Sequence, residues 1–173
     1  MEKNNISEKA IEENVIIQQQ NGHITLWALR IILRLNLKER FIKHHNVLTT
    51  AEILQPLGLM DYFDTDMYGE NDNTKKTIQR MEQQLLRLEK KVPSVDDILR
   101  KNIHLLGQSL SLSEIEKDIL QLSASFYQNN GLGFLTDMVG ELNTQQTKQI
   151  LAVILSRSIE QIDAALNVKS TLL

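Results

Sequence analysis

The chain has 173 residues, of which 42% are hydrophobic and 24% are charged, as in an ordinary globular protein. It contains no cysteine, which excludes disulfides, thiolate zinc sites and cysteine nucleophiles and favours a reducing compartment. The formal net charge of -3 gives no overall attraction to nucleic acid, and seven glycines and two prolines are too few for turn-rich β-structure.

The N-terminal part predicts two helices. Residues 6–20 form a weak amphipathic pattern, and their polar start has no basic and then apolar export signal. Residues 24–37 are the longest apolar stretch, but Arg30 and Arg34 interrupt it and it is shorter than the ~20 residues that cross a bilayer. We therefore expect a cytoplasmic protein without a membrane segment, in which the second helix lies in the core.

Two faces are distinguishable on this second helix. Trp27 shares one face with Ile24 and Ile31, which predicts that Trp27 is a core residue. The other face begins a local excess of positive charge, for which nucleic acid, an acidic protein surface and solvent alone are the alternatives. The basic residues of this group are Arg30, Arg34, Lys38, Arg40 and Lys43.

The chain divides into three regions by pattern. Residues 1–60 form an N-terminal helical part, and residues 61–73 are polar and aperiodic, which predicts the main exposed loop. Residues 74–173 show helical periodicity almost throughout and predict a C-terminal helical bundle. No sustained alternation indicates a strand. We expect an all-α, irregular multi-helix bundle that forms one compact domain.

Capping patterns divide the C-terminal bundle into helices. Ser113 with Glu116, Asn143 with Gln146, and Ser158 with Gln161 are three capping boxes, which mark helix starts. Gly107 is predicted to end the helix before the first box. Residues 129–131 are predicted to end the preceding helix, and a short helix is expected over residues 134–142.

Motifs that would carry chemistry are incomplete. Residues 69–77 resemble a phosphate-binding loop, but Thr74 replaces the second glycine and Lys76 replaces the hydroxyl that binds Mg²⁺. Residues 64–75 match only the first half of a calcium loop. His44 and His45 are adjacent and cannot chelate one metal from a helix, and His104 is interpreted as a core histidine. We expect no cofactor, no metal site and no catalytic residue, so the chain is not predicted to be an enzyme.

Residues 132–157 also fit a helix-turn-helix, a nucleic-acid-binding motif. Its second helix offers polar side chains for base edges, but Lys148 and Arg157 are its only basic residues and several carboxylates are near them. Duplex affinity depends largely on neutralised phosphates, so nucleic acid is an unlikely partner. A helix-turn-helix regulator remains the alternative function.

Three segments carry a family resemblance: residues 29–43, the stretch 105–120 that contains Leu-Ser-x-x-Glu, and residues 150–173. In this order they resemble the N-terminal helical region of large bacterial AAA-type ATPases, ahead of the ATPase domain. The resemblance implies a non-catalytic interaction or regulatory domain, cut from a longer chain, that recruits a substrate or adaptor protein to a ring-forming motor. No ATPase residue transfers, since neither Walker motif has a counterpart here.

Overall fold

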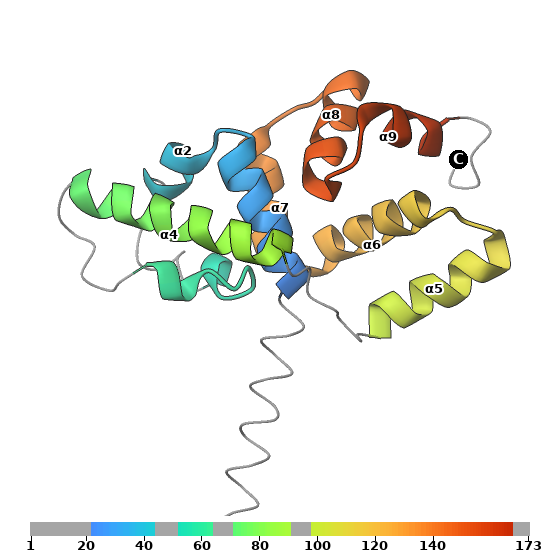
Figure 1. The fold of residues 1–173 in the computed structure, drawn as a ribbon, viewed down its shortest axis with the longest axis horizontal. Coiled ribbons are helices and arrows are strands. Elements are labelled where there is room, and N and C mark those ends of the chain that lie inside the picture. The colour runs from blue at the N-terminus through green and yellow to red at the C-terminus, as the bar shows by residue number, and fades with distance from the viewer. Residues whose placement is uncertain (1–21, 44–51, 64–70, 91–97, 168–173) are drawn as a thin grey trace, which may run out of the picture.

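The computed structural model describes residues 22–43, 52–63, 71–90 and 98–167, and the regular structure within them is helical throughout (Figure 1). The prediction of an all-α, multi-helix fold is confirmed. The helices and helical turns are residues 22–34, α2 (Lys38–Lys43), residues 52–54, η1 (Met60–Tyr62), α4 (Asn71–Lys90), α5 (Ile98–Leu110), α6 (Glu114–Gln128), α7 (Asn130–Val139), α8 (Thr144–Leu155) and α9 (Ile159–Ala165).

The helix of residues 22–34 occupies the centre of the molecule. Its residues 25–32 are all buried, including Thr25 and Arg30, and Trp27 belongs to the core as expected. The helix ends where Asn36 takes a left-handed conformation (φ 59°) and the Leu37 N–H donates to the Ile32 carbonyl at 3.0 Å. This ending is a common helix stop, and it turns the chain into α2.

One large hydrophobic core joins the N-terminal and C-terminal parts of the chain. It contains Leu29 and Ile32 of the central helix, Met81 of α4, Leu122 of α6 and Leu135 of α7. A second, small cluster consists of Ile119, Ile162 and Ala165, where α9 packs on α6. The expected regions 1–60 and 74–173 therefore share the larger core in their described residues.

The remaining helices lie around the central helix. In Figure 1, α2 and α4 lie at one end of the molecule and the antiparallel pair of α5 and α6 lies at the other. Among the labelled helices, α5 packs mainly against α6, and α8 forms a hairpin with α9 that rests on α6. No helix in the described ranges is both long and apolar enough to cross a membrane.

All three capping boxes are confirmed. The side chains of Ser113, Asn143 and Ser158 accept from the backbone N–H three residues later, and the Glu or Gln at that position accepts in return. These reciprocal bonds satisfy N–H groups that a helix start leaves without partners. The starts of α6, α8 and α9 are thus encoded locally.

Helix α7 starts earlier than expected, at Asn130 instead of residue 134. The cause is Asn129, which is both the last cap of α6 and the first cap of α7. Its N–H donates to the Ser125 carbonyl at 3.0 Å, its side-chain oxygen accepts from the Leu132 N–H at 3.0 Å, and its amide nitrogen donates to the Pro56 carbonyl at 3.0 Å. The predicted helix break is therefore a single residue, Asn129, between α6 and α7.

Two other expected boundaries were wrong. Helix α4 begins at Asn71, so the expected loop over residues 61–73 is helical at its end, and residues 64–70 lie outside the described part. Helix α5 continues through Gly107 to Leu110 and ends where Ser111 takes a left-handed conformation, with the Leu112 N–H donating to the Gly107 carbonyl at 2.8 Å. A serine therefore occupies the position that usually favours glycine.

Candidate functional site: a polar cavity and the apolar face of α5

A cavity of about 490 Å³ lies where the central helix, α4, α5, α6 and the turn after α8 meet. This volume is within the range of small-molecule sites. The ionisable residues on its walls are His23, Arg30, Glu89, Arg100, His104, Glu114, Lys117, Asp118 and Arg157. Four side chains of apolar character, Leu26, Trp27, Ile103 and Leu155, also line it.

Arg30 lies deepest among these ionisable groups, with 7% of its surface exposed. Its Nε donates to Glu89 Oε1 at 3.1 Å, and its Nη1 donates to the Ile154 carbonyl at 2.6 Å. Burial lowers the pKa of Arg30, whereas the hydrogen bond and the charge of Glu89 raise it. Because arginine stays charged even with a lowered pKa, this is a buried cation that ties the central helix to α4 and α8.

Glu89 is shared by two arginines. The same Oε1 that accepts from Arg30 also forms an ion pair with Nη2 of Arg34, one turn along the central helix. A carboxylate between two guanidinium groups offsets the repulsion that Arg30 and Arg34 would otherwise exert on each other. The end of α4 is thereby held against the central helix.

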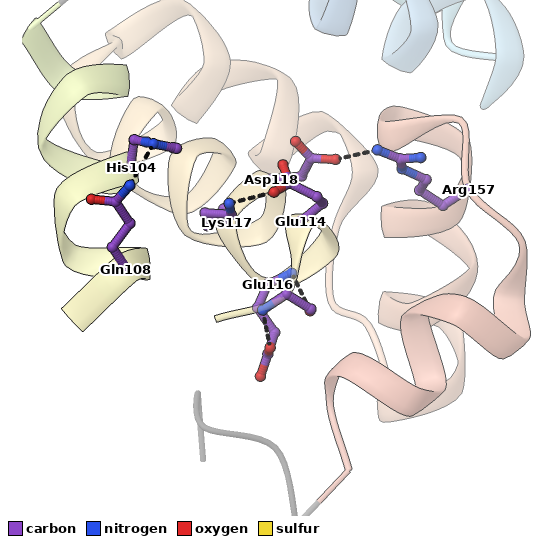
Figure 2. A network of polar contacts seen from close by, with 8 residues as sticks. His104, Gln108, Glu114, Glu116, Lys117, Asp118 and Arg157 are labelled. Carbon is purple, nitrogen blue, oxygen red and sulfur yellow. Dashed lines mark hydrogen bonds and ion pairs between the residues drawn. The ribbon is translucent and has the colours of Figure 1, made fainter. Parts of the chain in front are cut away.

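The first turns of α6 also line the cavity, and Figure 2 shows the side chains that project from them. Ser113 and Glu116 fix the start of this helix, so that Glu114, Lys117 and Asp118 project from its first turns. Lys117 pairs with Glu114, and Arg157 Nη2 donates to Asp118 Oδ2 at 2.7 Å. The hydrogen bond from Lys117 is the main cause that lowers the pKa of Glu114.

Gly107 allows the side chain of Lys117 to lie close to the backbone of α5. A Cβ atom at Gly107 would lie 2.5 Å from Cδ and 2.9 Å from Cγ of Lys117, which is too close for carbon atoms. The glycine therefore lets the aliphatic part of Lys117 cross α5 directly.

The predicted basic residues do not form one surface. Arg30 and Arg157 line the cavity, while Lys38 lies 4.0 Å from Glu82 and Arg40 Nη1 donates to the Met138 carbonyl at 2.9 Å. Lys148 pairs with Asp163. The side chain of Lys43 lies outside the described residues. Because Arg30 is buried and bonded within the fold, it is not available for docking by a macromolecule.

Several cavity residues were not found from the sequence. Arg100, Glu89 and Lys117 come from three different helices, and no short spacing connects them. The only local signal was the capping box of Ser113, which fixes where α6 begins and hence which of its residues lie at the cavity. Tertiary packing brings Arg100, Glu89 and Lys117 to the same cavity.

His104 was expected in the core, but the structure places it at the surface. Its ring nitrogen lies 3.1 Å from Gln108 Nε2, one turn along α5 (Figure 2). The apolar periodicity of α5 misled the interpretation, because much of its apolar surface is not covered. In the described ranges no group of three or more side chains is arranged to hold a metal ion.

The uncovered surface is a second feature of α5. Ile103 and Gly107 face α6 and are buried, whereas Ile98 and Leu105 are 78% and 61% exposed. Leu106 and Leu110 are also exposed. We call Ile98, Leu105, Leu106 and Leu110 the apolar face of α5. Several exposed large apolar residues on one helix are a feature of interaction sites.

Parts of the motifs that are incomplete in the sequence can be located in the structure. Residues 71–77, the second part of the resemblance to a phosphate-binding loop, belong to α4 and form no loop. The half calcium loop and the His44–His45 pair fall mostly or wholly outside the described residues. The helix-turn-helix of residues 132–157 stays a prediction, and α8 packs on α9 and α6.

The chain was compared with models of protein families, with curated protein sequences and with solved structures. None of the three comparisons gave a match.

Proposed function

We propose that this chain is a non-catalytic interaction domain that binds a protein partner through the apolar face of α5. The observation that carries the proposal is the exposure of Ile98, Leu105, Leu106 and Leu110 on a helix that packs against α6 and buries only Ile103 and Gly107.

The spacing of these residues suits the recognition of a helix or an apolar groove. Ile98 and Leu105 are seven residues apart, and Leu106 and Leu110 are four apart, so each pair lies along one side of α5. Full burial of a leucine or isoleucine side chain stabilises a complex by roughly 1.5–3 kcal/mol. Burial of the exposed parts of these four side chains would therefore contribute to the stability of a complex.

The resemblance to the N-terminal regions of bacterial AAA-type ATPases supports the same kind of role. On that basis we propose that the partner is the ATPase domain of a longer parent chain, or an adaptor or substrate of that motor. The alternative, a helix-turn-helix regulator, has less support. Its basic residues Lys148 and Arg157 are paired with Asp163 and Asp118, and phosphate contacts would have to compete with these carboxylates.

Photo-crosslinking in the native host tests the proposal. A photoreactive phenylalanine derivative at Leu105 should give a discrete covalent adduct, whose protein component mass spectrometry identifies. The matched control carries the same group at Gln79, an exposed position of α4. The proposal fails if Leu105 gives no adduct, or if both positions give the same adducts.

A variant with two added carboxylates on α5 provides a second test of the proposal. Leu105→Asp with Leu106→Asp should abolish the adduct formed from a photoreactive group at Ile98, because the carboxylates would be buried in the complex. Both leucines are exposed, so circular dichroism and the melting temperature should stay close to those of the unaltered chain. An adduct that persists in this variant would argue against the apolar face of α5.

A further inference from the structure

We propose that the polar cavity binds a small organic acid through one carboxylate, which Arg30 anchors. This inference does not depend on the apolar face of α5 or on the identity of a protein partner.

The first argument is the hydrogen bonding of Arg30. A guanidinium has five N–H donors, and two of them are used in the described residues, by Glu89 and by the Ile154 carbonyl. Nη2 has no acceptor there, although the side chain is buried and lines the cavity. Buried donors are almost always satisfied, so an acceptor within the cavity is expected. A carboxylate matches the planar geometry of the unused donors.

The second argument is the charge of the walls, which favours one negative charge over two. The cations are Arg30, Arg100, Lys117 and Arg157, and the carboxylates are Glu89, Glu114 and Asp118. Four positive and three negative groups leave an excess of one positive charge when the histidines are neutral. A phosphate dianion would add a second negative charge near Glu114 and Asp118, and this repulsion disfavours it.

The third argument is the apolar part of the lining. Leu26, Trp27, Ile103 and Leu155 provide surface that an inorganic ion would leave without contacts. The ring of His23 stacks on that of Trp27, with centroids 5.9 Å apart, so an aromatic surface forms part of the wall. An acid with a hydrocarbon or aromatic body fits both the charge and the lining.

The single tryptophan of the chain provides a direct measurement, because Trp27 lines the cavity. Phenylacetate is the probe, and inorganic phosphate at equal ionic strength is the comparison. We expect a saturable change in Trp27 fluorescence with phenylacetate and none with phosphate. The side-chain ¹⁵N signal of Arg30 in the unaltered protein should move over the same concentrations, and this readout needs no variant.

Variants then locate the site. Arg30→Lys keeps the charge and loses the planar fork, so the Kd for phenylacetate should rise about tenfold. Arg157→Gln, at an exposed wall position, should weaken binding about threefold through lost attraction. Arg87→Gln is the matched control, since it removes the same charge from an exposed part of α4 outside the cavity and should leave the Kd unchanged.

Four outcomes would overturn the proposal. They are the absence of saturation with phenylacetate up to about 10 mM, tighter binding of phosphate than of phenylacetate, an Arg30 signal that does not move, and equal weakening by Arg157→Gln and Arg87→Gln. A failure of Arg30→Lys to fold would leave the Arg30 signal and the two glutamine variants to decide.

Discussion

Two glycines in α7, two residues apart, provide a sharp test of how this helix docks. Gly131 and Gly133 both lie inside the helix, where alanine is normally preferred by about 0.5–1 kcal/mol. A Cβ at Gly131 would lie 2.6 Å from Leu57 Cγ and 2.8 Å from the Ile53 carbonyl oxygen, whereas a Cβ at Gly133 has nothing within 4 Å. The same substitution should therefore have opposite effects at the two positions.

The expected magnitudes follow from these contacts. Gly133→Ala should raise the free energy of unfolding by about 0.5–1 kcal/mol through helix propensity alone. Gly131→Ala gains the same propensity but forces α7 away from a backbone oxygen, and such overpacking costs about 1–3 kcal/mol. We expect Gly131→Ala to be destabilising, with a difference of about 1–3 kcal/mol between the two variants.

Urea unfolding followed by circular dichroism measures both free energies, and an unchanged slope with denaturant confirms that the midpoints report stability. Equal stabilisation by both variants would show that α7 does not approach residues 53 and 57 as closely as described. The docking of the N-terminal part onto α7 would then need revision.

Three further changes test other parts of the structure. Glu89→Gln should lower the free energy of unfolding by roughly 2–3 kcal/mol in urea titrations, because it leaves the buried Arg30 without its carboxylate partner; no loss would mean that this ion pair does not hold α4. Trp27→Ala should cost about 3–5 kcal/mol, since only 7% of the surface of Trp27 is exposed; a nearly unchanged melting temperature would show that Trp27 is not a core residue. Burial, with a smaller effect of Asp61, raises the pKa of Tyr62, so the folded state holds this proton more tightly than the unfolded state. The contribution of Tyr62 to stability is therefore complete below the unfolded value of about 10 and is lost as the pH rises through the folded pKa. Tyr62→Phe should remove that part of the alkaline loss in a pH series of melting temperatures, and an unaltered series would contradict the assignment.

The sequence predicted what is encoded locally. The starts of α6, α8 and α9 follow from side chains that bond to N–H groups three residues away, and the burial of the central helix follows from its predominantly apolar sequence. The boundaries that were wrong depend on contacts between distant segments. Gly107 lies inside α5 beside Lys117 of another helix, and no local pattern distinguishes such a glycine from one that ends a helix.

The same distinction applies to the candidate site. Arg30 was identified as part of a basic face, but its burial depends on Glu89 and Ile154, which are 59 and 124 residues away in the chain. A helix ahead of the Ser113 capping box was predicted from the sequence, yet a sequence pattern does not show whether a partner helix covers its apolar residues. His104 was placed in the core for this reason, although α6 covers only one side of α5.

The junction at Asn129 limits how the length of the chain can change. Because α6 and α7 share this one residue as a cap, no spacer is present to absorb an insertion. One residue added inside the first turn of α7 would rotate the rest of that helix by about 100° around its axis. Leu132, Leu135 and Met138 would then leave the core together. Between Gly140, the last cap of α7, and Asn143, the first cap of α8, residues 141 and 142 belong to neither helix and can absorb an insertion. A one-residue insertion between α7 and α8 should therefore leave the fold intact, whereas the same insertion in the first turn of α7 should unfold the protein.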